Sequence, residues 1–180
     1  MNYFFSSYYP YIIIYAGFSS RNIIKITVVK FIKKKRNCMG DFGEIIAIGG
    51  GGFGRNPNNP IIEKYIVDQS AKKNPNVCFI PTASAEDKQY TVNYYTAFTK
   101  LNCNPIHLNF FTRTPRLDSL INKQDIIYVG GGNTKSMLAV WREWKLDKLL
   151  LKAYNRGAIL CGVSAGAICW FEKGVTDSWA

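Results

Sequence analysis

Residues 158–167 read AILCGVSAGA, and this stretch indicates the fold most directly. An apolar run ends in Gly162-Val163-Ser164-Ala165-Gly166, and small and apolar residues follow it. A G-x-S-x-G sequence between a strand and a helix is typical of a nucleophile elbow, in which a tight turn lifts the serine hydroxyl above the sheet. We therefore predict a strand over 158–163, a helix after it and a nucleophilic Ser164, with the N–H of Ala165 directed at a developing oxyanion.

Four further apolar runs precede this one, and they alternate with longer amphipathic stretches. Such alternation is typical of βα units around a parallel sheet, and continuous apolar runs suit strands that are covered on both faces. We predict strands at 44–48, 76–81, 105–110 and 125–129, and helices at 60–72, 90–101, 134–144 and 145–155, with a weaker one at 117–122. The expected fold class is α/β, a three-layer α/β/α sandwich with a mainly parallel sheet.

Small residues follow several of these strands, at the edge where parallel sheets form their ligand sites. The glycines of 49–54 allow close backbone approach, but no helix follows them directly, which argues against a dinucleotide site. The loop PTAS at 81–84 fits a capped turn and a substrate-facing role equally well. In GGGNT at 130–134, Thr134 can cap a helix, and the glycines can direct N–H groups at an oxyanion.

The composition of the 180 residues, 47% hydrophobic and 19% charged, excludes wholesale disorder and predicts one domain. The net charge is +11, but residues 1–38 hold seven basic and no acidic residues, which leaves 16 basic and 12 acidic residues for 39–180. We therefore expect neither nucleic acid nor a membrane as a partner of the folded domain. The cysteines show no C-x-x-C pair and indicate reduced thiols in a cytoplasmic protein: Cys38, Cys78, Cys103, Cys161 and Cys169.

Residues 1–38 form a basic, aromatic leader whose composition changes abruptly at Met39. Three interpretations are open: a translation start assigned too early, with Met39 as the true first residue; a poorly ordered extension; or a membrane-surface anchor that uses the basic cluster 33–36. No apolar run in the chain reaches the roughly 20 residues needed to cross a bilayer. We expect residues 39–180 to form the domain and residues 1–38 to be disordered or wrongly included.

The motifs at 81–84, 130–134 and 162–167, in this order, resemble those of the peptidase E (aspartyl dipeptidase) family of serine peptidases. That family has a sandwich similar to class I glutamine amidotransferases, and the resemblance covers Glu44 to the end of the chain. It implies hydrolysis of a small peptide substrate, with release of an N-terminal residue, typically aspartate, from a dipeptide or short peptide. It implies no metal or cofactor, and it leaves a homodimer open.

The resemblance also implies roles for particular residues. Ser164 would be the nucleophile, and the oxyanion hole would consist of the N–H groups of Gly132 or Asn133 and of Ala165. Asp177 lies where the family places the acidic residue that orients the catalytic histidine, and Glu172 is a second choice.

The catalytic base has no candidate in the expected place. The one histidine, His107, precedes the elbow on a predicted strand, where a structural or surface role is expected, whereas in the family the histidine follows the serine. Because none follows Ser164, we expect an incomplete chain that is inactive without that histidine. The alternative is a non-catalytic amidotransferase-like binding domain or a gene fragment.

Selectivity for an N-terminal aspartate would require a cation in the substrate pocket. Three basic residues are candidates, although each is also typical of a surface charge: Arg113, Arg116 and Lys135.

Overall fold

The computed structural model describes residues 13–16, 26–29 and 43–178. Their strands form a sheet in the order β1-β2-β3-β7-β6-β4-β5. Five of them run parallel and confirm the predicted α/β class: β3 (Ile45–Ile48), β7 (Ile159–Val163), β6 (Ile126–Val129), β4 (Asn76–Ile80) and β5 (Asn104–His107).

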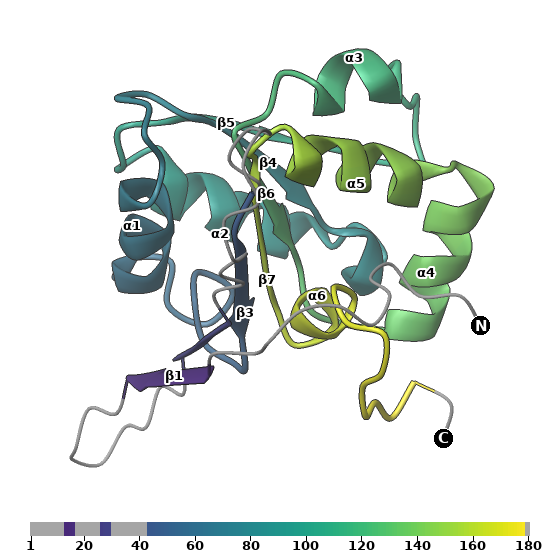
Figure 1. The fold of residues 1–180 in the computed structure, drawn as a ribbon, viewed down its shortest axis with the longest axis horizontal. Coiled ribbons are helices and arrows are strands. Elements are labelled where there is room, and N and C mark those ends of the chain that lie inside the picture. The colour runs from purple at the N-terminus through teal and green to yellow at the C-terminus, as the bar shows by residue number, and fades with distance from the viewer. Residues whose placement is uncertain (1–12, 17–25, 30–42, 179–180) are drawn as a thin grey trace, which may run out of the picture.

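Helices cover both faces of the parallel strands (Figure 1). One face carries α1 (Ile61–Asp68) and α2 (Lys88–Phe98). The other face carries α3 (Leu117–Ile121), α4 (Thr134–Glu143), α5 (Leu146–Asn155) and α6 (Ala165–Ile168). A short 3-10 helix, η1 (Thr82–Ser84), follows β4. The three layers agree with the expected sandwich.

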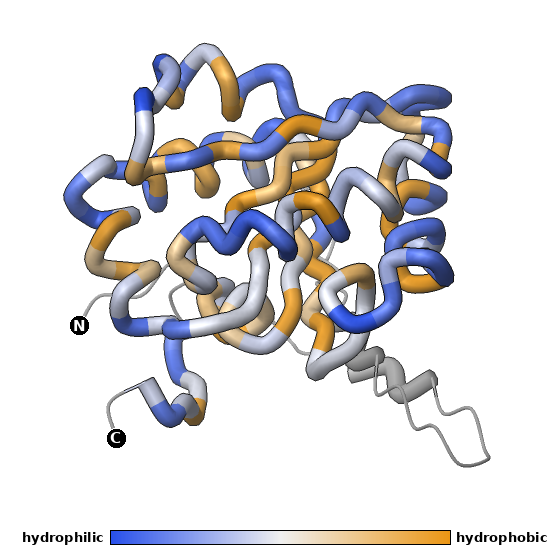
Figure 2. The backbone as a smooth tube through the Cα atoms, turned by 180° about the vertical axis from the view of Figure 1, so that it is seen from behind, coloured by the Kyte–Doolittle hydropathy of each residue, from blue (hydrophilic) through white to orange (hydrophobic). Residues whose placement is uncertain are grey.

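Two hydrophobic clusters hold the layers together. The cluster beneath α1 and α2 is rich in aromatic rings: Phe79 stacks on Tyr94 with ring centroids 4.9 Å apart, and Phe53 meets Phe79 edge-on at 5.2 Å. The cluster on the other face includes the fully buried indoles of Trp141 and Trp170. Figure 2 shows apolar central strands flanked by helices in which apolar and polar positions alternate. This pattern is expected when helices bury one stripe against a sheet.

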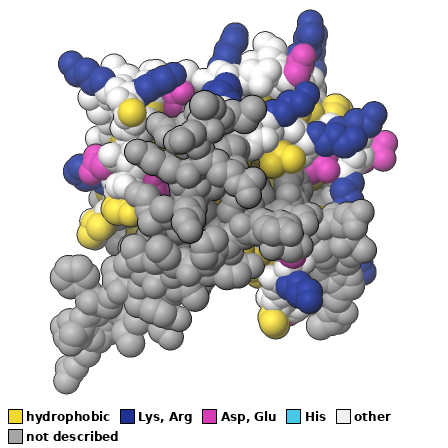
Figure 3. Space-filling view, in the orientation of Figure 1, with side chains coloured by type: hydrophobic (Ala, Val, Ile, Leu, Met, Phe, Trp, Pro, Cys, Tyr) yellow, Lys and Arg dark blue, Asp and Glu magenta, His cyan; other side chains and the backbone are white. Residues whose placement is uncertain are grey.

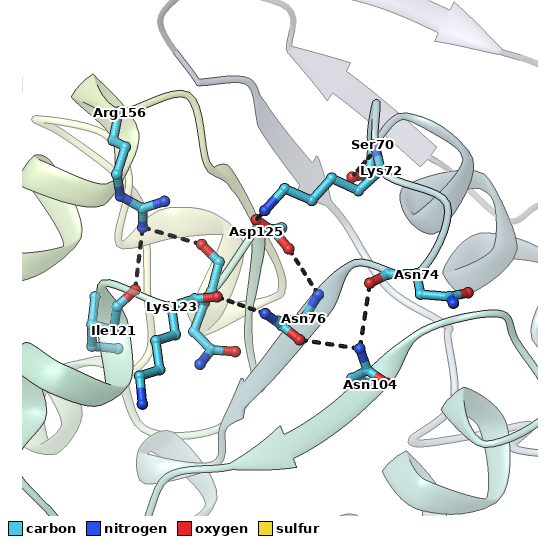
Figure 4. A network of polar contacts seen from close by, with 10 residues as sticks. Ser70, Lys72, Asn74, Asn76, Asn104, Ile121, Lys123, Asp125 and Arg156 are labelled. Atoms are coloured by element: carbon cyan, nitrogen blue, oxygen red, sulfur yellow. Dashed lines mark hydrogen bonds and ion pairs between the residues drawn. The ribbon is translucent and has the colours of Figure 1, made fainter.

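A network of polar contacts fixes the amino-terminal ends of β4, β5 and β6, opposite the edge where the strands end (Figure 4). Asp125 accepts a hydrogen bond from the N–H of Asn76 at 2.9 Å and forms an ion pair with Lys72 at 2.7 Å. The amide of Asn104 donates to the Asn76 side chain at 3.2 Å, and Arg156 donates to two backbone carbonyls before β6. These contacts tie the three strands together at their amino-terminal ends.

Most predicted elements are present, with shifts at their ends. The predicted helix 60–72 ends at Asp68, because its buried stripe, which includes Ile62 and Val67, does not continue into the exposed residues 71–74. The predicted strand 105–110 ends at His107, because β4, its only neighbour among the described strands, ends at Ile80.

The leader contains two strands that the sequence did not predict. β2 (Ile26–Val29) pairs antiparallel with β3, and β1 (Ile13–Ala16) pairs antiparallel with β2. The remainder of residues 1–42, which includes Cys38, lies outside the described residues, so the three interpretations of the leader stay predictions. Within the described part of the chain, no helix is both long enough and apolar enough to span a bilayer.

Candidate active site

Ser164 stands on the predicted strand–turn–helix, between the end of β7 and the start of α6. Its backbone has φ 55° and ψ −115°, a conformation that costs a non-glycine residue of order 1 to 3 kcal/mol and persists only where the surroundings enforce it. The surroundings do so through hydrogen bonds: the N–H of Ser164 donates to the carbonyl of Ile48 at 3.0 Å, and the carbonyl of Ser164 accepts from Ala167 at 2.8 Å. The residue itself is exposed, so its hydroxyl group can meet a ligand.

The two glycines of the elbow are required by close packing. A Cβ on Gly162 would lie 2.4 Å from the carbonyl oxygen of Gly166, and a Cβ on Gly166 would lie 2.2 Å from the carbonyl oxygen of Val129. Both distances are far below van der Waals contact, so only glycine lets the elbow rest on the end of β6.

The glycine loop 130–132 lies alongside the serine. A Cβ on Gly131 would be 3.3 Å from the Cβ of Ser164. Gly132 has φ +138°, and a Cβ there would lie 2.1 Å from the carbonyl oxygen of Ala83 in η1. The loop is therefore held between the elbow and η1.

The two residues predicted as alternatives for the first oxyanion donor differ in whether the backbone N–H is already hydrogen-bonded. The N–H of Asn133 donates to the carbonyl of Ala83 at 2.7 Å and is already engaged. The N–H groups of Gly132 and Ala165 form no backbone hydrogen bond to another described residue. Of the predicted pair Gly132 or Asn133, Gly132 is thus the residue with an available donor.

The cap of α4 differs from the prediction. Thr134 was expected to cap this helix, but Asn133 does so, because its extended backbone lets its side chain accept from the N–H of Ser136 at 2.8 Å. Thr134 is the first helical residue, and its N–H donates to the hydroxyl of Ser178 at 2.9 Å. The segment after α6 therefore returns to the start of α4.

This return places Asp177 near the start of α4, between two residues that bond to each other: the hydroxyls of Thr176 and Ser178 are 2.9 Å apart. Asp177 is exposed, and among the described residues no hydrogen bond or ion pair joins it to Ser164. Glu172 is half-buried in the turn after α6.

His107 lies away from the elbow, as the expected structural role requires. It ends the edge strand β5, and β4 and β6 separate it from β7, which corresponds to about 14 Å across the sheet. Its Nδ1 is 2.8 Å from the hydroxyl of Tyr95, and burial lowers its pKa, while nearby Glu86 opposes the shift.

The three candidate cations are all exposed. Arg113 and Arg116 follow β5 at the outer edge of the sheet, and Arg116 is 3.4 Å from Asp118. Lys135 lies in the first turn of α4, so it is the candidate nearest in the chain to the glycine loop 130–132.

Sequence reasoning missed a buried polar cluster beneath the glycine-rich loop 49–54. The carboxylate of Glu63 is fully buried and accepts from the N–H of Phe53 at 2.7 Å, and burial raises its pKa. The hydroxyl of Tyr90 accepts from the N–H of Gly131 at 3.4 Å, and burial raises the pKa of Tyr90 to about 12. The sequence contains one sign that Glu63 is buried, because it adjoins Ile62 within the apolar stripe of α1.

Thiols and acids form no metal centre in the part of the chain that the structure describes: no three His, Cys, Asp or Glu side chains are grouped to hold an ion. Cys78, Cys161 and Cys169 are buried and Cys103 is half-buried, all four as free thiols. Burial raises the pKa of Cys103 to about 11, so this thiol is not activated as a nucleophile.

Similar proteins are peptidases by name. Uncharacterized peptidase YgaJ of Bacillus subtilis strain 168 is 49% identical over 137 residues, which cover 75% of this chain and 59% of YgaJ. Uncharacterized peptidase Lin0382 of Listeria innocua serovar 6a is 33% identical over 111 residues, which cover 60% of this chain and 53% of that protein. The chain thus spans between half and three fifths of the length of these relatives.

Solved structures agree with the fold. The "Putative Peptidase E Protein" of Listeria monocytogenes EGD-e matches with a TM-score of 0.50 and 30% identity over 58% of this chain and 54% of that chain. A peptidase from an acI-B1 Actinobacterium matches with a TM-score of 0.57 over 71% of this chain and 56% of that one, and its 20% identity supports the fold alone.

The sequence profile of peptidase family S51 matches residues 45–180. This span includes every parallel strand of the sheet, the glycine loop 130–132 and the elbow. The chain belongs to peptidase family S51.

Proposed function

We propose that the chain carries the nucleophile and the oxyanion hole of a serine peptidase of the peptidase E type. Its substrates would be dipeptides or short peptides, from which it releases an N-terminal residue, aspartate above all. The observation that carries the proposal is the backbone of Ser164, held at φ 55° on an exposed elbow beside the available N–H groups of Gly132 and Ala165.

The chemistry follows from these positions. The Ser164 oxygen attacks the scissile carbonyl carbon and gives its proton to a base, and the carbonyl oxygen takes the negative charge. The N–H groups of Gly132 and Ala165 stabilise that oxyanion, and one such donor is worth roughly 10² to 10³ in rate. The base returns the proton to the leaving amine, and water then hydrolyses the acyl-enzyme.

The proposal assigns the catalytic base of the triad to none of the described residues. His107 lies on the edge strand β5, where the Tyr95 hydroxyl of α2 contacts its ring. Asp177 remains the proposed acidic member of the triad. Missing base catalysis removes roughly 10² to 10⁴ in rate, so we expect residues 1–180 alone to hydrolyse peptides slowly or not at all.

The proposed partner is a small peptide in the cytoplasm, bound without metal or cofactor, and a homodimer is the assembly to test. On the face drawn in Figure 3, the described Lys and Arg side chains are interspersed with acidic ones. A face of mixed charge differs from the continuous basic patch or stripe that is typical of proteins that bind nucleic acid.

The test is peptide hydrolysis by the protein purified from its own source. We expect release of aspartate from Asp-Leu, with a loss of at least about 10³-fold in kcat/KM in Ser164→Ala. Ser119→Ala, which removes an exposed hydroxyl on α3, serves as the matched control and should leave the rate unchanged. Equal hydrolysis by wild type and Ser164→Ala would refute the assignment. Retained peptide binding without hydrolysis would favour the alternative, a non-catalytic amidotransferase-like binding domain or gene fragment.

A further inference from the structure

An open pocket of about 290 Å³ lies between the glycine-rich loop 49–54 and the first turns of α2. It is lined by Gly54, Ser84, Asp87, Gln89, Tyr90 and Asn93. The loop and α2 are joined there, because the rings of Phe53 and Tyr90 lie 5.0 Å apart. The pocket opens at the edge where the parallel strands end, which is also the edge that carries Ser164.

Two walls of the pocket touch the glycine loop 130–132. The hydroxyl of Tyr90 accepts from the N–H of Gly131 at 3.4 Å, and a Cβ on Gly132 would lie 2.9 Å from the nitrogen of Ser84. Gly131 in turn lies against Ser164. The glycine loop 130–132 therefore lies between the pocket and the elbow as a single layer of residues, so the pocket is a near neighbour of Ser164 at the same edge of the sheet.

The lining of the pocket presents one carboxylate among neutral polar groups. Asp87 contributes a carboxylate, of which Oδ1 caps α2 by accepting from the N–H of Tyr90 at 2.6 Å. The hydroxyl of Ser84 donates to the carbonyl of Pro81 at 2.8 Å, so toward a ligand it can only accept. Gln89 donates one amide N–H to Asn93 at 2.9 Å, which leaves its carbonyl as an acceptor and its second N–H as a donor, so the Gln89 side chain remains neutral and able to do both.

No Lys, Arg or His is among the six residues that line the pocket. A carboxylate among neutral polar groups attracts a protonated amine and repels another carboxylate, because its charge is the one charge in the lining. We propose that this pocket is a substrate subsite that binds a protonated amine of the peptide, an inference that rests on the proposed peptidase function. The amine can come from the peptide's own N-terminus or from a lysine side chain.

The substitution Asp87→Asn isolates the charge, because asparagine caps a helix as well as aspartate does. The matched control is Asp68→Asn, which removes an exposed carboxylate at the C-terminal end of α1, nearer the opposite edge of the sheet. Both variants are made in the Ser164→Ala background of the full protein, so that bound peptides are not turned over. Urea unfolding checks that the two variants are equally folded.

Binding is followed by NMR, through the side-chain amides of Gln89 and Asn93. Three probes are titrated: glycinamide, which carries an α-ammonium; N-acetyl-lysinamide, which carries only a side-chain ammonium; and the α-amide of N-acetyl-aspartate, which carries a carboxylate. We expect at least one amine probe to bind with a dissociation constant roughly three- to tenfold higher in Asp87→Asn and unchanged in Asp68→Asn. A response to glycinamide alone assigns the pocket to the N-terminus of the peptide, and a response to N-acetyl-lysinamide alone assigns it to a lysine side chain.

Two results would overturn the proposal: equal amine affinity in Asp87→Asn and Asp68→Asn, or binding of the aspartate probe as tight as that of the amines. Because Ser164 is absent from this assay, its outcome does not depend on catalysis. Hydrolysis that persists in Ser164→Ala would disprove the proposed function and leave the binding result standing. Failure of amine binding would leave the role of Ser164 intact.

Discussion

Single residues decide whether the elbow can exist. Gly166 is helical, and a Gly→Ala change in a helix is ordinarily stabilising by roughly 1 kcal/mol. Here the added Cβ would meet the Val129 carbonyl oxygen at 2.2 Å. For Gly166→Ala, helix propensity therefore predicts a gain in stability and packing predicts a loss.

We predict that Gly166→Ala lowers the free energy of unfolding by about 1 to 3 kcal/mol, because the backbone must shift to relieve the overlap. The matched control is Gly50→Ala, at a glycine where a Cβ would meet nothing within 4 Å, and it should change stability by less than about 0.5 kcal/mol. Urea titration of both variants provides the comparison. A stability gain in Gly166→Ala would show that the elbow is not packed against β6 in this way.

At the residue scale, sequence patterns predicted the serine and its glycines better than the partners of polar groups. The spacing G-x-S-x-G carries its own steric reason, so Ser164 could be placed from sequence. The choice between Gly132 and Asn133 could not, because it depends on Ala83, which lies about 50 residues earlier in the chain and accepts the Asn133 N–H. The cap of α4 was likewise assigned one residue too late.

At the scale of elements, α1 holds the glycine-rich loop through one buried carboxyl group. Glu63 is fully buried, its Oε1 accepts from Phe53, and burial raises its pKa above the ordinary value of 4.5. Between that value and the raised pKa of the folded state, the unfolded chain has lost the Glu63 proton while the folded protein keeps it. Stability therefore falls as the pH rises through this window.

We predict that Glu63→Gln removes this fall, because glutamine keeps an acceptor for Phe53 but does not titrate. The difference in the free energy of unfolding, variant minus wild type, should increase from pH 4.5 upward and become constant above the raised pKa. Urea unfolding at a series of pH values measures it. Parallel profiles for the two proteins would mean that Glu63 does not change its charge on burial.

The ends of elements were less predictable than their existence. The apolar runs located all five parallel strands, because strands covered on both faces have continuous apolar sequences. The end of β5 depends on the end of its neighbour β4, and the pairing of β2 with β3 depends on contacts made far apart in the chain. Neither is encoded in a local pattern.

At the scale of the whole molecule, the order of strands creates the candidate site. β7 lies between β3 and β6, so the elbow emerges between the two glycine-rich loops that follow its neighbours. The sequence could place each motif at the end of a strand, but it could not predict the order of the strands in the sheet. This order also explains why His107, on the outer strand β5, is remote from Ser164.

A fluorophosphonate that reacts with the protein purified from its own source identifies the nucleophile. Such reagents modify activated serines, and mass spectrometry of the tryptic peptide 157–173 locates the adduct. We expect one adduct, on Ser164, and we expect the variant Ser164→Ala to lose both the adduct and peptide hydrolysis. If the protein hydrolyses peptides but carries the adduct on another residue, Ser164 is not the nucleophile.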